Sequence, residues 1–384
     1  MKHILFLSNG YGEDTISSFI IDSLKQKIDT YNISAFPLVG TGKSYTSFNI
    51  HLRGPMKEMP SQGDLHSVSR ILQDIRTGLL NLLWDQYLFL RSLKGSLSLT
   101  VAVGDIYPVL MAAFSGLRPI IFMGTAKSNW YYPYSFPEKF LLKRFCLATF
   151  ARDLPTTEDL KNFGINSIWA GNPMMDCFNI TGENFGVKGD NKIIGILPGS
   201  RDVAYRDFPI ILSSLEKLSE NLSDPLVFLV ALSPSIRVEK LADSSSGWNP
   251  ELSDNRTSGI AGYLRKSSLE IKLIQGKFGD VINISDIIIG QAGTGNEQAA
   301  GLGKPVVAFD SEGKEKMGWY RARQKGLLGD ALSIVKPDGE SIAGEVIAIL
   351  RDKNRREYMS KIGKERMKEE GSIDRITDEI IKFL

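Results

Sequence analysis

Short apolar or β-branched runs alternate with helix-length amphipathic stretches along most of this chain. This alternation is typical of repeated strand–helix units, whose strands form parallel sheets covered by helices. The runs fall into two series, and each series resembles one doubly wound, Rossmann-like sheet. The expected strands of the first series are His3–Leu7, Ser34–Pro37, Leu99–Val103, Pro119–Met123, Thr149–Ala151 and Ser167–Ala170, and those of the second are Ile193–Leu197, Leu226–Ala231, Glu270–Ile274, Asp286–Gly290, Pro305–Phe309 and Leu332–Val335.

A length of 384 residues agrees with two domains of roughly 100–200 residues each. The segment 173–192 is rich in Gly, Asn and Pro and shows no periodicity, so we interpret it as a linker. The polar stretch 243–259 predicts a long surface loop. The expected organisation is an N-terminal domain at 1–172, the linker at 173–192, a C-terminal domain at 193–360, and a C-terminal helix at 361–384 that could pack back on the N-terminal domain.

The composition excludes several classes of protein. With 46 basic and 44 acidic residues, the chain lacks the bulk positive field of a nucleic-acid-binding protein. Cys146 and Cys177 are far apart in the sequence, and His3, His51 and His66 are scattered, so no metal site is expected. The N-terminal apolar run is too short for a signal peptide, and no apolar stretch reaches the ~20 residues that span a bilayer. We therefore expect a cytoplasmic protein with reduced cysteines.

The stretch GILPGSRDVAYRDFP, which begins at Gly195, places a turn directly after an expected buried strand. Gly199 permits a close backbone approach, Ser200 can donate its hydroxyl, and Arg201 supplies a forked cation. Together these groups suit a phosphate or diphosphate. Taken alone, the motif fits equally well a tight turn whose arginine forms a surface salt bridge.

A second glycine-containing turn follows the expected strand Asp286–Gly290. The backbone amides of Gly293, Thr294, Gly295 and Asn296 would point at an anion, with a helix dipole behind them. A generic turn of an α/β domain is the alternative. Two such turns on neighbouring strands of one sheet indicate a diphosphate site between them.

Three stretches together resemble the lipid-A-disaccharide synthase group of glycosyltransferases. They are LPGSR at Leu197–Arg201, AGTGNEQAA at Ala292–Ala300 with GKP at Gly303–Pro305, and GNPMMD at Gly171–Asp176. That group carries L-P-G-S-R, G-T-x-x-x-E-A-A-x-x-G-x-P and G-H-P-x-x-D stretches. The resemblance spans most of the chain and is strongest between about residues 170 and 310. It implies an α/β protein with the GT-B fold, in which two Rossmann-like doubly wound domains face a central cleft. It also implies a nucleotide-sugar donor on the C-terminal domain, an acceptor in the cleft, and no need for a metal.

The sequence departs from the pattern of this group at three places. The glutamate that holds the nucleotide ribose in the group aligns with Gln298, and the acid here is Glu297. The N-terminal G-E-x-S-G-D stretch is replaced by GYGED at Gly10–Asp14, and the aromatic S-V-W-A-W segment is matched only loosely by SNWYY at Ser128–Tyr132. These departures favour a relative with a different donor or acceptor.

Acidic residues follow two expected strands of the N-terminal domain. Glu13 and Asp14 lie at the exit of the first glycine turn, which holds Gly10 and Gly12, and Asp105 follows the strand Leu99–Val103. Ligands of open α/β sheets bind beyond such strand ends. A carboxylate there could act as the general base that deprotonates an acceptor hydroxyl. The alternative is that Asp14 and Asp105 cap helices.

Two further segments are candidates for contact with the acceptor. Residues 78–94 predict a helix that is apolar around most of its circumference, either buried between layers of the domain or lying in a membrane surface with Arg76, Arg91 and Lys94 at the headgroups. Residues 129–145 begin with Asn129 and Trp130 and carry aromatics that could stack on a sugar ring or close the cleft.

The leading prediction is a glycosyltransferase that moves a sugar from a nucleotide-diphosphate sugar, with UDP as the expected nucleotide, to a small or lipid acceptor. No cofactor is expected, because the nucleotide sugar is a substrate. Peripheral contact with the inner face of a membrane is compatible with this prediction, and the oligomeric state is open. The alternatives are a UDP-sugar epimerase or hydrolase of the same fold and a non-catalytic nucleotide-binding relative.

Overall fold

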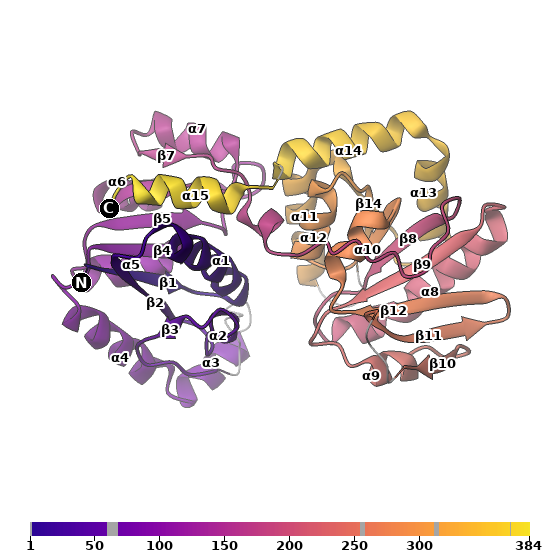
Figure 1. Cartoon of the computed structure of the whole chain (residues 1–384), viewed down its shortest axis with the longest axis horizontal. Helices are drawn as coiled ribbons and strands as arrows, with labels where there is room; N and C mark the ends of the chain where they lie inside the picture. Colours follow the sequence, from indigo (N-terminus) through magenta and orange to yellow (C-terminus); the bar gives the residue numbers. More distant parts are fainter. Residues whose placement is uncertain (1, 60–67, 254–257, 311–314, 369) are drawn as a thin grey trace. The chain divides into compact units, whose positions relative to one another are not determined.

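The computed structural model describes residues 2–59, 68–253, 258–310, 315–368 and 370–384. The chain forms two compact units, of which unit 1 comprises Met1–Cys177 and Glu370–Leu384 and unit 2 comprises Phe178–Glu369 (Figure 1). The division lies inside the expected linker 173–192, most of which belongs to unit 2. The Asp280 carboxylate anchors this segment, because it accepts hydrogen bonds from the backbone amides of Thr181 and Gly182 at 2.6 and 2.8 Å.

Unit 1 is built on a fully parallel seven-stranded sheet with the order β3-β2-β1-β4-β5-β6-β7. The predicted strands of the first series are confirmed, and only the two-residue β3 was not expected. The strands read as apolar runs because helices bury both faces of the sheet. The strands are β1 (Lys2–Ser8), β2 (Tyr31–Pro37), β3 (His51–Leu52), β4 (Leu99–Gly104), β5 (Ile120–Gly124), β6 (Cys146–Phe150) and β7 (Ser167–Ile168).

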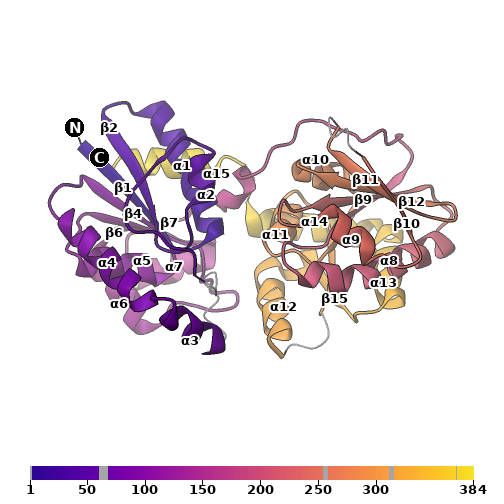
Figure 2. The same cartoon turned by 90° about the horizontal axis from the view of Figure 1, so that it is seen from below.

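Helices cover both faces of this sheet (Figure 2). An apolar cluster of buried side chains lies on each face. One cluster contains side chains of α1, α2 and α15, and the other contains side chains of α4, α5, α6 and α7. The helices of unit 1 are α1 (Tyr11–Lys27), α2 (Lys43–Thr46), α3 (Val68–Arg76), α4 (Leu79–Ser92), α5 (Ile106–Phe114), α6 (Phe136–Phe145), α7 (Leu154–Asn162), the 3₁₀ turn η1 (Pro173–Asp176) and α15 (Ser372–Ile381).

The C-terminal helix α15 belongs to unit 1 and lies beside α1 (Figure 1). Ile373, Ile376 and Ile380 are buried in the same cluster as the apolar face of α1. Asp176 fixes the start of this helix, because its two carboxylate oxygens accept the amides of Gly371 and Ile373 at 2.7 and 2.6 Å. The expected helix 361–384 is in fact divided, since residues up to Met367 form the end of α14 in unit 2.

Unit 2 is built on an eight-stranded sheet with the order β10-β11-β12-β9-β8-β13-β14-β15. The six strands β12, β9, β8, β13, β14 and β15 are parallel to one another. Strands β10 and β11 add an antiparallel meander at the edge next to β12. The strands are β8 (Lys192–Leu197), β9 (Leu226–Leu232), β10 (Asn249–Leu252), β11 (Ile260–Lys266), β12 (Leu269–Gln275), β13 (Ile287–Gly290), β14 (Val306–Phe309) and β15 (Leu332–Val335).

Each expected strand of unit 2 is followed by a helix. They are α8 (Val203–Asn221), α9 (Val238–Asp243), α10 (Phe278–Ile284), α11 (Thr294–Gly301), α12 (Glu315–Leu328), η2 (Gly329–Ala331), α13 (Gly339–Arg351) and α14 (Lys353–Met367). The expectation of a surface loop at 243–259 is wrong for its centre, where Asn249–Leu252 form β10 and Trp248 is buried. All four residues of β10 are exposed, so its sequence shows no alternation of apolar and polar positions. Residues 254–257 lie outside the described part of the chain.

Candidate functional site

Each sheet has a point at which the order of its strands reverses. In unit 1 this point lies between β1 and β4, and in unit 2 it lies between β8 and β13. The chain connections on the two sides of such a point leave in opposite directions, so a crevice opens beyond the carboxyl ends of the two strands, where α/β proteins bind ligands. The expected acidic residues of unit 1 and the expected phosphate loops of unit 2 all follow these strands.

The two expected phosphate loops of unit 2 lie side by side. The amide of Gln291, directly after β13, donates to the carbonyl of Leu197 at the end of β8 over 2.7 Å. Gly199 has φ +100°, a left-handed conformation that favours glycine, and a Cβ there would lie 3.4 Å from the carbonyl oxygen of Gln291. Ser200 and Arg201 follow with exposed side chains. A cation and a hydroxyl therefore stand next to the loop after β13.

The loop after β13 leads directly into α11. Gly293 is the N-cap residue and Thr294 the first helical residue, so the amides of Gly293, Thr294 and Gly295 have no carbonyl four residues earlier within the helix. The amide of Asn296 bonds the carbonyl of Gly293 at 3.1 Å, and its fully buried side chain donates to the carbonyl of Gly290 at 2.9 Å. Asn296 thus shapes the loop, and the amides of Gly293, Thr294 and Gly295 are the groups suited to an anion.

Glu297 and Gln298 differ in exposure. This difference matters because the glutamate of the lipid-A-disaccharide synthase group aligns with Gln298, whereas the acid in this sequence is Glu297, one position earlier. Gln298 is 6% exposed, whereas Glu297 is half-buried. Burial raises the pKa of the Tyr320 hydroxyl, and the nearby Glu297 carboxylate adds to the rise, while the charge of Arg201 opposes it. Glu297 and Arg201 therefore both lie close enough to Tyr320 to act on its hydroxyl.

Asp14 is fully buried in unit 1. Its Oδ1 accepts the hydroxyl of Ser8 at 2.6 Å, and that hydroxyl also contacts the Tyr45 hydroxyl at 2.6 Å. The Oδ2 atom is buried without a hydrogen-bond partner among the described residues. Burial raises the pKa of Asp14 to about 7. Asp14 does not cap α1, whose N-cap residue is Gly10, and it has no exposed surface.

Asp105 and Glu13 are half-buried at the carboxyl edge of the sheet. Asp105 is the N-cap residue of α5, and its Oδ1 accepts both the amide of Tyr107 at 2.8 Å and the side-chain amide of Asn9 at 2.7 Å. The Glu13 Oε1 accepts the hydroxyl of Thr125, directly after β5, at 2.7 Å. Each acid is therefore oriented by a polar residue that follows another strand of the same sheet, namely β1 for Asn9 and β5 for Thr125.

Asn9 and Thr125 were missed by the sequence analysis, although each follows an expected strand. Their partners lie 96 and 112 residues away in the sequence, and only the order of the parallel strands brings them together. A search for polar residues directly after each expected strand would have found both, because such residues gather at one edge of a parallel sheet.

The remaining acceptor-side candidates lie at the same edge of unit 1. Gly10 ends the first turn, and a Cβ at Gly12 would meet open space. Asn129 donates its backbone amide to the Thr156 hydroxyl at 2.8 Å, and Trp130 is half-buried beside it. The loop that carries them is folded back on itself, because the Tyr131 hydroxyl donates to the carbonyl of Ala126 at 2.9 Å. These contacts fix the segment that follows Thr125 and carries Asn129 and Trp130.

The GNPMMD motif has a structural role. Asn172 caps η1 by accepting the amide of Met174 at 3.1 Å, and Asp176 holds the start of α15, as described above. These contacts account for Asn172 and Asp176 without a ligand.

Helix α4 is buried on one side only. Leu82, Gln86 and Leu90 are buried, whereas Leu80 and Trp84 are 61% and 60% exposed. The sequence left two interpretations of the helix at residues 78–94, burial between two layers or a position in a membrane surface. Burial between two layers is wrong for the side of α4 that carries Leu80 and Trp84. The apolar face, as we call this surface, comprises the exposed residues Leu72, Ile75, Leu80, Trp84, Leu88, Phe114, Phe136 and Phe140 of the neighbouring helices α3 to α6. Within the described residues, no helix has the length and apolar character to cross a membrane.

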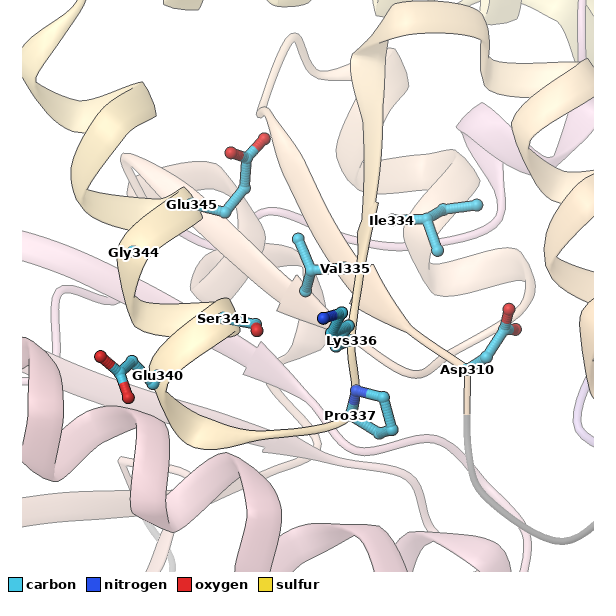
Figure 3. A pocket seen from close by; sticks show the side chains of 9 residues that line it. All are labelled: Asp310, Ile334, Val335, Lys336, Pro337, Glu340, Ser341, Gly344 and Glu345. Atoms are coloured by element: carbon cyan, nitrogen blue, oxygen red, sulfur yellow. The ribbon is translucent and has the colours of Figure 1, made fainter.

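A hollow of about 660 Å³ lies at the edge of unit 2 beside β15 and α13 (Figure 3). Its charged lining consists of Asp310, Glu340, Glu345 and Lys336. An excess of carboxylates does not suit a diphosphate, and the phosphate loops after β8 and β13 do not line it. Across the described part of the chain, no three His, Cys, Asp or Glu side chains are gathered in a way that could hold a metal ion.

Comparison with solved structures identifies the fold. The calicheamicin glycosyltransferase CalG4 is 12% identical and covers 100% of this chain and 98% of its own, with a TM-score of 0.64. UDP-GlcNAc 2-epimerase from Neisseria meningitidis, solved with UDP-GlcNAc bound, is 17% identical and covers 99% of this chain and 100% of its own, with a TM-score of 0.57. The chain thus has the two-domain α/β GT-B fold predicted from the sequence.

No family model matches the chain. Among curated proteins, lipid-A-disaccharide synthase from Geobacter sulfurreducens is 28% identical over 153 residues, which cover 38% of this chain and 34% of that protein. The match thus spans about a third of the relative's length. It confirms the resemblance inferred from the motifs, because over these residues the chain is similar in sequence to lipid-A-disaccharide synthase.

Proposed function

We propose that this protein is a glycosyltransferase that moves a sugar from a nucleotide-diphosphate sugar to an acceptor hydroxyl. The observation that carries the proposal is the pair of adjacent loops after β8 and β13. The first loop carries the exposed Arg201, and the second leads into the first-turn amides of α11. Cations and helix N-termini favour the two negative charges of a diphosphate. The sequence relationship with lipid-A-disaccharide synthase supports the choice of reaction.

In this proposal the two units have different tasks. Unit 2 binds the donor, with Ser200, Arg201 and the Gly293–Gly295 amides on the diphosphate and Glu297 on the ribose hydroxyls. These donors also stabilise the charge that develops on the departing diphosphate, so turnover does not require a metal ion. In unit 1, Asp105 or Glu13 takes the proton from the acceptor hydroxyl as it attacks the anomeric carbon.

Thermal unfolding of the full chain in the presence of nucleotides tests the donor half of the proposal. A ligand that binds only the native state raises its stability. We expect UDP, and to a smaller degree another nucleoside diphosphate, to raise Tm, with uridine much weaker because it lacks the diphosphate. The absence of any shift with a panel of nucleoside diphosphates and nucleotide sugars at millimolar concentration would contradict the proposal.

An epimerase is the second candidate, because the UDP-GlcNAc 2-epimerase of Neisseria meningitidis has the same fold. The two reactions differ in their need for an acceptor. An epimerase converts UDP-GlcNAc alone, which proton NMR of the sugar would show, whereas a glycosyltransferase releases UDP only when an acceptor is present. Inversion of carbon 2 in the sugar of UDP-GlcNAc without an acceptor would favour the epimerase and contradict the proposed glycosyltransferase.

We further propose that the apolar face of unit 1 docks on an anionic membrane surface, which would give access to a lipid acceptor. Leu80, Trp84 and Leu88 are spaced by four residues and form one exposed stripe of α4. The exposed cations Arg76, Arg91 and Lys94 flank this stripe and can reach the headgroups. Apolar side chains and cations together are typical of helices that lie in a membrane interface.

Flotation with lipid vesicles tests this docking. We expect the protein to float with vesicles that contain phosphatidylglycerol and to bind weakly to pure phosphatidylcholine. The double variant Trp84→Ser, Leu88→Ser should lose most of this binding. The matched control Leu252→Ser, Tyr358→Ser removes exposed apolar side chains of unit 2 and should float like the wild type. Equal flotation of both variants would refute the docking surface.

A further inference from the structure

A series of hydrogen-bonded, buried polar side chains lies beneath the loop after β13 in unit 2. We call this loop, which comprises residues 291–295, the donor loop, because it is proposed to bind the sugar donor. Arg321 and Gln324, both on α12, are 1% and 5% exposed. Arg321 donates from Nε to the carbonyl of Phe309 at 3.1 Å, from Nη1 to the Gln324 Oε1 at 2.7 Å, and from Nη2 to the Gln291 Oε1 at 2.5 Å. Full burial of an arginine is unusual, since it removes a strongly hydrated cation from water.

Gln324 connects this arginine to the donor loop. Its Nε2 donates to the carbonyls of Ala292 and Gly293 at 3.2 and 3.1 Å, and its Oε1 also accepts the side chain of Asn296 at 3.2 Å. Arg321 determines this orientation, because a guanidinium has only donors and must face the oxygen of the amide. The nitrogen of Gln324 is thereby directed at the two loop carbonyls.

The direction of these two carbonyls determines the direction of two loop amides. In a trans peptide the C=O of one residue and the N–H of the next point to opposite sides. When Gln324 holds the carbonyls of Ala292 and Gly293 toward the protein interior, the amides of Gly293 and Thr294 point away from it. These are two of the amides assigned above to the diphosphate.

The same chain of side chains reaches the helix that follows the first phosphate loop. Gln291 presents its oxygen to Arg321, so its Nε2 faces Asp207 on α8, whose Oδ2 lies 3.3 Å away. Asp207 is 1% exposed and also accepts from Arg206 at 3.0 Å. The helices that follow β8 and β14 are thus linked through the first residue of the donor loop.

We propose that Gln324, oriented by Arg321, is a positioning residue that presents the Gly293 and Thr294 amides to the donor diphosphate. This inference rests on the proposed nucleotide-sugar function of the site. Gln324 itself does not touch the ligand. It acts through the peptide planes of the loop, and its loss affects the diphosphate more than the nucleoside.

Calorimetric titration of the full chain with UDP and with uridine tests the inference. Gln324→Met keeps the size of the side chain and removes its hydrogen bonds. The variant loses the two neutral hydrogen bonds that hold the carbonyls of Ala292 and Gly293. We therefore expect the affinity for UDP to fall about 10-fold and that for uridine to stay within about 2-fold. Gln86→Met is the matched control, because Gln86 is a fully buried glutamine of unit 1 that also donates to two carbonyls, those of Leu38 and Pro55. It should bind both ligands like the wild type.

Equal loss of UDP and uridine affinity in Gln324→Met, or unchanged UDP affinity, would overturn the positioning role. If the methionine variant does not fold, Gln324→Glu replaces it, since a carboxylate still accepts from Arg321 but cannot donate to the loop. Failure of the wild type to bind UDP would instead contradict the proposed function. Crystal structures of the unliganded proteins then test the positioning separately, because the Ala292 and Gly293 carbonyls should turn outward in the variant and remain inward in the wild type.

Discussion

The side-chain amide of Asn9 donates a hydrogen bond of 2.7 Å to the carboxylate of Asp105, across the point at which the strand order of unit 1 reverses. This contact leaves no room for a side chain at position 104, because a Cβ at Gly104 would lie 1.7 Å from the Oδ1 of Asn9. The same Asp105 oxygen accepts the amide of Tyr107, so both bonds hold the carboxylate in one orientation at the carboxyl edge of the sheet.

Asp105→Asn tests the role of this carboxylate in catalysis. The amide oxygen of asparagine can still cap α5, so we expect little change in stability. A general base typically contributes about 10²–10⁴-fold in rate, so turnover should fall by about that factor while the donor dissociation constant stays the same. Steady-state kinetics with saturating acceptor, combined with calorimetry of UDP binding, would measure both quantities.

Glu13→Gln is the parallel experiment for the second acid. The amide oxygen of the substituted side chain could still accept the Thr125 hydroxyl, so the local structure should be kept. One of the two variants should show the large loss of turnover, and the other a small one. Wild-type turnover in both variants would contradict the assignment of a unit 1 carboxylate as the base.

Much of the fold could be predicted because buried parallel strands leave a clear pattern. Every residue of β4 is buried, and its sequence reads as an apolar run that ends at a glycine. By contrast, β10 lies at the edge of its sheet with all residues exposed, and β3 has only two residues, so neither leaves such a pattern.

The side chains of the candidate site could be predicted only in part. The glycines, Arg201 and Asp105 were visible because each follows an expected strand. The burial of Asp14 was not visible, because the side of α1 around it carries Ser17 and Ser18 rather than apolar residues. The support from Arg321 and Gln324 depends on contacts across 30 and 31 residues of sequence, which local patterns do not report.

Arg201→Ala should weaken binding of a nucleoside diphosphate more than binding of the nucleoside. The substitution removes a charge-assisted contact to phosphate worth about 1.5–3 kcal/mol. Calorimetry with UDP and uridine would measure the two losses. Arg351→Ala serves as the control, because Arg351 bonds the carbonyl of Asn221 at the other end of α8. An equal loss for UDP and uridine would exclude a contact between Arg201 and the diphosphate.

Asp176→Ala should loosen the C-terminal helix without affecting nucleotide binding. The variant leaves the amides of Gly371 and Ile373 without their acceptor, and loss of a cap typically costs about 0.5–2 kcal/mol. Hydrogen exchange of the α15 amides should accelerate, while the exchange of α13 in unit 2 stays unchanged. Unaltered protection of α15 would show that apolar packing against α1 alone fixes the helix.

The buried Asp14 should make the stability of unit 1 depend on pH. Burial raises its pKa from 3.8 in the unfolded chain to about 7 in the folded protein. Between these values the folded state binds more protons than the unfolded state, so the free energy of unfolding falls as the pH rises from 4 to 7. A shift of about three pKa units corresponds to about 4 kcal/mol. This stability is fully present below pH 4 and is lost once the pH exceeds 7.

Asp14→Asn removes this titration and keeps an oxygen that can accept the Ser8 hydroxyl. We therefore expect the variant to gain stability relative to the wild type as the pH rises from 5 to 8. Urea-induced unfolding at several pH values would measure the difference between the two proteins. Asp29→Asn, which changes an exposed carboxylate just after α1, is the control and should parallel the wild type at every pH. A difference between Asp14→Asn and the wild type that does not vary with pH would show that Asp14 is ionised in the folded protein throughout this range, stabilised by Ser8 and its surroundings despite its burial.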